Sequence, residues 1–285
     1  MKIYFANMFG AKGLEQYLKH KIDILAAFPS FPKSGIKEKP LFCDSLFVDS
    51  GAFGKHSKKV DIDSYIKFIK ENESLIDIYA NLDVIGDPVA TYKNQRTMEK
   101  AGLNPLPVFH YKSDPKWIQR YINKGHDYIS LGGMVPINGN QLRYWLDDIW
   151  ENYLLTTNRR ARVKVHGFGL QYPDFIQRYP WYSIDAASVH IMARYGGIYT
   201  PWGTLKINPK VNSREMGWQI KTPKVLEQIQ EWVDNLELNF SFESARENNT
   251  QGTLRRCAIS IQYLSNYFQE LSSMPLQKNN TPKLF

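Results

Sequence analysis

Short apolar segments alternate with longer amphipathic segments over roughly the first 190 residues, and this alternation restricts the fold more than any other feature. The short segments have the length and composition of buried strands, whereas the segments between them carry apolar residues at helical spacing. Eight strands are predicted in this way, at residues 2–7, 23–28, 45–48, 77–82, 106–109, 128–131, 162–165 and 181–184. Helices are predicted at residues 14–21, 60–73, 88–102, 115–124, 142–155 and 174–179.

Regular alternation of strands and helices requires parallel strands joined by crossover helices. Eight such units close into a (β/α)8 TIM barrel, which is the α/β fold that the sequence favours. An open doubly wound sheet is the alternative, but neither GxGxxG nor GxxxxGK(S/T) follows any predicted strand.

The alternation stops near residue 190. The segment YGGIYTPWGTLKIN, at residues 195–208, is rich in glycine and aromatic residues and indicates a hairpin or an insertion. Helices are expected at 222–236 and 253–271, and residues 276–285 resemble a frayed tail. We therefore expect one domain, with a barrel over about 1–190 and an insertion with C-terminal helices over about 191–275.

Composition narrows the class of protein. Hydrophobic residues make up 43% of the 285 residues, which excludes a largely disordered chain. The formal charge of +8 favours an anionic partner. Cys43 and Cys257 are the only cysteines, so a disulfide framework is excluded and a reducing cytoplasm is expected. No apolar run approaches the ~18–20 residues of a membrane span, so we expect no membrane partner and a cytoplasmic location.

Polar or flexible residues follow the predicted strands at equivalent places. They are Asp49, Asp83, His110, Gly132-Gly133, His166-Gly167 and Asp185. Any one of them could be a helix cap, a satisfied histidine or a turn, but in a barrel the strand ends converge on one face. Together they predict a site.

The chemistry of this set is mainly that of carboxylates, which act as general acids, bases or nucleophiles. A pair of carboxylates can cleave a glycosidic bond when one attacks the anomeric carbon and the other protonates the leaving group. A metal site at Asp49, Asp83 and His110 would lack HxH or HExxH spacing, so no metal is expected.

Six motifs occur in a specific order between residues 45 and 210. They are VDSGAFG (48–54), NLDVIGDP (81–88), PVFH (107–110), LGGM (131–134), HGFG (166–169) and the block SIDAASVHIMARYGGIYTPWGTLKIN (183–208). Their order and spacing resemble those of the tRNA-guanine transglycosylases, or queuine tRNA-ribosyltransferases, barrel enzymes that exchange guanine for a 7-deazaguanine. The last block resembles the nucleophile block of this family, with Asp185, Arg194, Gly196, Thr200 and Gly203 at matching positions.

The resemblance implies roles for individual residues. Asp185 would be the nucleophile and Asp49 the general acid and base, and the chemistry would need no cofactor. The residues expected to bind the substrate base are Ser50, Asp83, His110, Gly132, Gly133, Met134 and His166. Basic residues in several clusters are expected to contact nucleic-acid phosphates, namely Lys55, Arg159, Arg160, Arg194 and Lys206.

The sequence also departs from the family. The tRNA enzymes carry a zinc site of three closely spaced cysteines and a histidine, whereas Cys257 stands alone here, and His110 occupies the place of a base-contacting glutamine. The better match is the DNA-modifying branch, which is often phage-encoded and would act in the host cytoplasm. The partners would be DNA and a free 7-deazaguanine such as preQ0, with accessory proteins left open.

Three alternatives remain. The nearest is a tRNA-guanine transglycosylase that lacks the zinc site, with tRNA as its partner. A non-catalytic nucleic-acid-binding barrel is a second. A glycoside hydrolase is a third, although such enzymes usually carry Glu at strand ends, and here the strand-end acids are all Asp.

Overall fold

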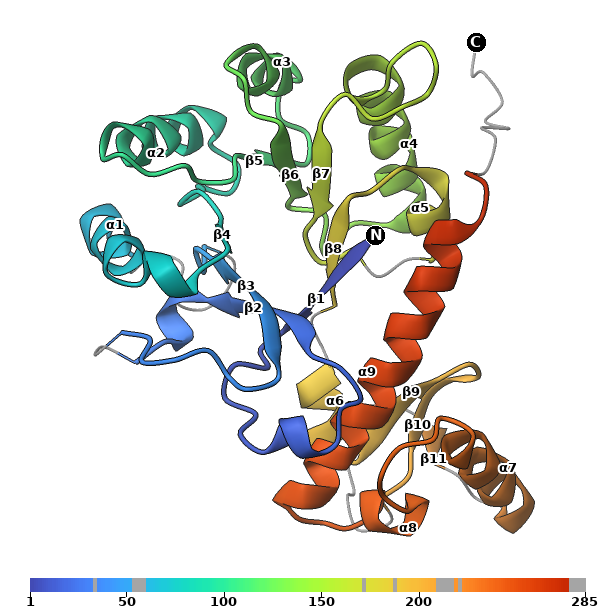
Figure 1. The fold of residues 1–285 in the computed structure, drawn as a ribbon. Helices are drawn as coiled ribbons and strands as arrows, with labels where there is room; N and C mark the ends of the chain where they lie inside the picture. The colour runs from blue at the N-terminus through green and yellow to red at the C-terminus, as the bar shows by residue number, and fades with distance from the viewer. Residues whose placement is uncertain are drawn as a thin grey trace.

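The computed structural model describes residues 1–32, 35–52, 60–170, 173–186, 189–208, 218–219 and 222–276. These residues form an α/β protein around a curled parallel sheet, in which eight strands are described (Figure 1). The strands are β1 (Lys2–Ala6), β2 (Ile22–Ala27), β3 (Cys43–Asp49), β4 (Ile78–Tyr79), β5 (Val108–His110), β6 (Tyr128–Gly132), β7 (Lys164–Gly167) and β8 (Ser183–Ala186). Each overlaps the range predicted for it, so the prediction of eight strands is confirmed.

The order of the strands is that of a TIM-barrel-like sheet. It runs β4-β3-β2-β1-β8-β7-β6-β5, and every neighbouring pair is parallel. A parallel bridge between Ala80 and Leu106 links the two edges, β4 and the segment that leads into β5. At this bridge the Leu106 amide donates to the Tyr79 carbonyl at 2.8 Å, and the Asn81 amide donates to the Leu106 carbonyl at 2.9 Å.

Helices follow each strand from β3 to β7 on the outside of the sheet (Figure 1). They are α1 (Ile62–Glu71), α2 (Pro88–Lys100), α3 (Lys116–Asn123), α4 (Gly139–Ile149), extended by a π-helical turn (Trp150–Leu154), and α5 (Pro173–Arg178). Asp61 and Asp87 cap the first two of these helices by accepting from Ser64 N and Ala90 N. The helices predicted at 60–73, 88–102, 115–124, 142–155 and 174–179 are therefore confirmed.

The helix predicted at residues 14–21 is wrong. Only a 3-10 turn (Leu14–Gln16) forms there, directly after Gly13, which has a left-handed backbone with a φ of 90°. The last helix, α9 (Thr250–Ser273), packs against this turn and against β1 instead. Leu254 and Ala258 of α9 share a buried cluster with Phe5 and Leu14, so a distant segment covers the sheet where a crossover helix was expected.

The chain after β8 builds a small additional layer beside α9 (Figure 1). Its elements are α6 (Val189–Arg194), β9 (Gly197–Thr200), β10 (Gly203–Lys206), β11 (Trp218–Gln219), α7 (Pro223–Asp234) and α8 (Phe242–Ala245). β9 and β10 are antiparallel, which confirms the hairpin expected at 195–208, and α7 and α9 confirm the two late helices. This layer has its own buried cluster, which includes Ile198, Ile229 and Phe242. None of the helices within the described ranges is long and apolar enough to cross a membrane.

Alternation along each strand decides which side chains enter the sheet's interior. In β3, Leu46 and Val48 belong to the outer cluster beneath the helices, whereas Phe47 belongs to an inner cluster. Successive side chains on a strand point to opposite faces, so Asp49 faces inward like Phe47. In β8 the outward Ile184 is followed by Asp185, which faces inward for the same reason.

Candidate active site

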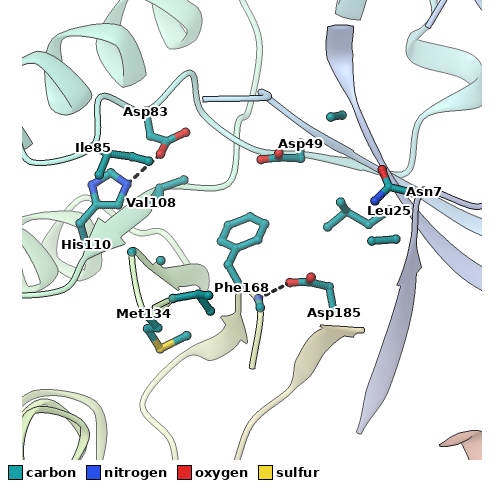
Figure 2. A pocket seen from close by; sticks show the side chains of 16 residues that line it. Asn7, Leu25, Asp49, Asp83, Ile85, Val108, His110, Met134, Phe168 and Asp185 are labelled. Atoms are coloured by element: carbon teal, nitrogen blue, oxygen red, sulfur yellow. Dashed lines mark hydrogen bonds and ion pairs between the residues drawn. The ribbon is translucent and has the colours of Figure 1, made fainter. Parts of the chain in front are cut away.

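A cavity of about 630 Å³ opens at the carboxyl end of the parallel strands (Figure 2). Its size lies within the range of about 300–1,000 Å³ that is usual for small-molecule sites. Seven residues predicted from the sequence line it, namely Asp49, Asp83, His110, Gly132, Gly133, Met134 and Asp185. The structure therefore brings together, from five strand ends and the loops that follow them, most of the predicted site.

One wall carries a carboxylate–imidazole pair, in which His110 is buried and Asp83 is partly exposed. His110 Nε2 lies 2.7 Å from Asp83 Oδ2, and the Ser50 hydroxyl donates to Asp83 Oδ1 at 2.8 Å. Both oxygens of Asp83 are thus held by the protein, and each keeps a lone pair for a ligand. Ser50 itself is fully buried behind Asp83 and does not line the cavity, so it orients the carboxylate from behind.

Asp49 faces Asp83 and Asp185 across the cavity (Figure 2). Burial removes water from its carboxylate, and the negative charge of Asp83 and, more weakly, that of Asp185 add to this effect. Together they raise the pKa of Asp49 to about 7. The Gly51 amide donates to Asp49 Oδ2 at 3.2 Å and opposes the shift only in part. Asp49 can therefore release and recover a proton near neutral pH.

The loop after Asp49 depends on a glycine. Gly51 has a φ of +77°, and a Cβ atom built on it would lie 2.5 Å from Pro29 Cδ. Both the left-handed backbone and this close approach exclude a larger residue. Gly51, two residues after Asp49, thus lets the chain turn tightly against the segment that follows β2.

Asp185 enters the cavity from the end of β8. The residue is 5% exposed, and its Oδ1 accepts a hydrogen bond from the Gly169 amide at 2.7 Å. In the part of the chain that the structure describes, Oδ2 has no hydrogen-bond partner. Because Asp185 lines the cavity, it offers a carboxylate fixed through one oxygen.

His166 was expected to contact the substrate base, but the structure places it beneath the cavity rather than along its wall. Its side chain is 0% exposed and does not line the cavity. The sequence predicted that its strand ends at residue 165, whereas β7 continues to Gly167. His166 therefore lies in register with Ser183, one inward layer below Asp185.

Nine residues that line the cavity were not predicted from the sequence, and two of them, Asn7 and Phe168, bring a polar or an aromatic side chain. Asn7 lines it directly after β1, with a φ of +62° that asparagine tolerates better than most residues. The rule that polar residues at strand ends mark the site would have found it. Phe168 also lines the cavity, and its ring lies between the Asp83–His110 pair and Asp185 in Figure 2.

The predicted phosphate contacts do not gather around the cavity. Arg159 and Arg160 precede β7, at the amino end of the sheet, and Arg159 donates to the Glu151 carboxylate at 2.8 and 2.9 Å. Lys206 is 5% exposed at the end of β10, which leaves little of its side chain for a phosphate. Arg194, the last residue of α6, is exposed.

Lys55, the remaining candidate for a phosphate contact, lies outside the described residues. Among the residues that are described, no three His, Cys, Asp or Glu side chains are arranged to hold a metal ion.

A scan against models of known protein families found no match to this chain. A search of curated proteins likewise found no similar sequence. The geometry of the site and the sequence motifs that form it are therefore the grounds for a function.

Proposed function

We propose that this chain is a base-exchanging transglycosylase that replaces guanine in DNA with a 7-deazaguanine such as preQ0, through a covalent glycosyl–aspartate intermediate. The observation that carries the proposal is that Asp49, with a pKa of about 7, faces the same cavity as Asp185. One carboxyl group can then move a proton while the other, held by the Gly169 amide, attacks carbon.

The reaction proceeds in two displacements. Asp185 attacks C1′ of the target nucleotide, the C1′–N9 bond breaks, and Asp49 gives its proton to the leaving guanine. The free 7-deazaguanine then enters the emptied pocket and loses its N9 proton to Asp49. Its N9 attacks C1′, and the electron pair of the sugar–aspartate bond returns to Asp185. Two inversions retain the configuration, as in retaining glycosidases.

The wall opposite Asp185 suits recognition of a purine edge. Asp83 is held by His110 and Ser50 with lone pairs still free, and a carboxylate accepts the N–H donors that guanine carries at N1 and N2. The Gly132-Gly133 backbone borders the same space. A base read in this way must leave the stack, so the target nucleotide is flipped or single-stranded.

DNA is favoured over tRNA because the zinc site of the tRNA enzymes has no counterpart here. The chain has two cysteines, and both are buried, Cys43 in β3 and Cys257 in α9. Neither is available to help build a three-cysteine site. We also propose that the sheet is a closed (β/α)8 barrel, with the Ala80–Leu106 bridge as its closing seam.

The test is incorporation of labelled guanine and of labelled preQ0 into duplex DNA, single-stranded DNA and tRNA, run in parallel on the wild-type chain. The proposal predicts incorporation into at least one form of DNA and little into tRNA. Preferential labelling of tRNA would contradict a DNA substrate and would favour a tRNA-guanine transglycosylase that lacks the zinc site. No labelling of any of the three, by a protein that is shown to be folded, would contradict the activity.

A further inference from the structure

A histidine lies directly beneath the Asp185 carboxylate, out of reach of the cavity. His166 Nε2 is 3.5 Å from Asp185 Oδ1, within the range of an ion pair but longer than a strong hydrogen bond. This nitrogen is buried and has no hydrogen-bond partner among the described residues. A buried imidazole nitrogen without a partner costs free energy, so its position under a functional carboxylate needs a physical reason.

The ring of His166 is held by aromatic packing. Its centroid lies 4.5 Å from that of Phe168, 5.0 Å from that of Phe47 and 6.1 Å from that of Tyr4, and all three contacts are edge-on. Edge-on contacts of this kind are favourable and leave little room for the ring to turn. The direction in which Nε2 points is therefore set by the interior of the sheet.

The other ring nitrogen ends a chain of hydroxyl groups. His166 Nδ1 lies 2.7 Å from the Ser183 oxygen, which in turn lies 2.5 Å from the Tyr128 hydroxyl. Burial raises the pKa of the Tyr128 hydroxyl, so this group keeps its proton. Ser183 has one proton to donate, and it gives this proton either to Tyr128 or to His166.

The carboxylate selects the direction of this chain. If His166 carried its proton on Nδ1, the bare Nε2 would turn a lone pair toward Asp185 Oδ1, which repels it. If Tyr128 donates to Ser183 and Ser183 donates to Nδ1, the ring proton is on Nε2 and faces the carboxylate. The second arrangement pairs both hydroxyl groups and Nδ1, and it replaces repulsion at Nε2 by attraction between the Nε2–H and the carboxylate 3.5 Å away.

We infer that His166 is a positioning residue for Asp185, which directs an Nε2–H at Oδ1 from inside the sheet and leaves Oδ2 to face the cavity. The Gly169 amide holds Oδ1 from a second direction. This inference rests on the proposed function, because it takes Asp185 to be the nucleophile. The positions of the protons on His166 and Ser183 do not depend on that function and can be measured in the ligand-free protein.

The arrangement has a consequence for the two displacements. Asp185 attacks through Oδ2, and Oδ1 becomes the carbonyl oxygen of the glycosyl ester. In the second displacement N9 of the incoming base bonds to C1′, the C1′–Oδ2 bond breaks, and its electron pair returns to the carboxylate. A donor at Oδ1 stabilises this departing carboxylate, so its loss slows the second displacement more than the first.

The first experiment reads the protons directly and needs no substrate. Nitrogen-15 NMR of the six histidines in the full chain, with His166 assigned by comparison with the His166→Gln variant, reports which ring nitrogen carries a proton. We expect a protonated Nε2 and a bare, hydrogen-bonded Nδ1, and a shift of the Nδ1 signal in Ser183→Ala. A protonated Nδ1 in the wild type, or an unchanged Nδ1 signal in Ser183→Ala, would overturn the inference.

The second experiment separates positioning from packing. His166→Met fills similar space without a donor, whereas His166→Gln keeps an amide donor near the place of Nε2. In His166→Met we expect the breakdown of the covalent DNA adduct to slow about tenfold, so that the adduct accumulates. In His166→Gln we expect most of the wild-type rate of adduct breakdown. Equal adduct turnover in the two variants and the wild type would contradict the inference. If no form of the protein exchanges bases, the NMR result still decides it, so the two failures are distinguishable.

Discussion

The two ends of the sheet's interior are built from the same strands but filled in opposite ways. Toward the amino end, inward positions hold large rings such as Tyr4 and Phe47, which are fully buried. One inward step further along the same strands, these rings give way to Ala6 and Asp49, and the interior opens into the cavity. The rings close the interior and stabilise it, whereas the carboxylates leave it open and place like charges close together. The amino end is therefore packed for stability, whereas the carboxyl end is where the proposed reaction would take place.

The largest effect that this contrast predicts is at Asp185, the proposed nucleophile. Asp185→Ala removes the attacking oxygens while leaving the buried rings below untouched, so base exchange should fall at least about a thousandfold. Exchange rates compared with circular dichroism of the same sample would show the loss in a folded protein. Activity close to that of the wild type would contradict the role of Asp185 as the nucleophile.

Asp49→Asn should have the next largest effect. An amide cannot transfer the proton, so exchange should fall by about 10² to 10⁴. Because Asp49 must be protonated when guanine leaves, and its pKa is about 7, kcat/KM for DNA in the wild type should decline above neutral pH. The pH profile of the residual activity in Asp49→Asn should lack this decline, and a profile that retains it would assign the titration to another group.

Stability should change in opposite directions at the two ends. Phe47→Ala leaves a cavity among the buried rings and should cost about 3–5 kcal/mol of unfolding free energy. Asp49→Asn should instead raise stability at pH 8. Its carboxyl pKa is raised in the folded state, so the wild type loses stability as the pH rises from about 4 through about 7, and the amide does not.

Urea unfolding of both variants and of the wild type at pH 4.5 and pH 8 measures this contrast. The advantage of Asp49→Asn over the wild type should shrink toward the lower pH. If Asp49→Asn is less stable than the wild type at pH 8, the Asp49 carboxylate makes a net stabilising interaction in the ligand-free protein, which would contradict this prediction.

The smallest effect concerns the basic residues. Arg159 is at the amino end and already pairs with Glu151, so Arg159→Ala should leave DNA affinity unchanged. Arg194 is exposed after β8, and Arg194→Ala should reduce the slope of log affinity against log salt by about one. DNA titrations at several salt concentrations measure both slopes. If only Arg159→Ala changes the slope, the nucleic acid binds at the amino end of the sheet, which would contradict the prediction.

The sequence revealed the strands and most of the site for the same physical reason. Short apolar runs followed by acids or glycines identify buried strands and the ends of those strands, and parallel strands bring such ends together. Asp49, Asp83, His110 and Asp185 were found in this way. What the pattern could not supply was the depth of a residue below the cavity, because the predicted end of a strand is uncertain by about two residues. That uncertainty put His166 on the cavity wall instead of beneath it.

Long-range packing was the other limit. The helix expected at residues 14–21 does not form, and α9 from the far end of the chain covers that part of the sheet. Local periodicity carries no information about which distant segment fills a gap. Closeness in sequence also does not fix the end of the sheet at which a residue lies, since Arg159 and Arg160 are near β7 in sequence but at its amino end, away from the cavity.

The most direct test of the account is the mass of the intact protein after brief incubation with a guanine-containing DNA oligonucleotide and denaturation. A glycosyl–aspartate intermediate predicts a covalent protein–DNA adduct in the wild type that maps by peptide analysis to Asp185, and no adduct in Asp185→Ala. Base exchange without any adduct on Asp185, or an adduct that persists in Asp185→Ala, would contradict it.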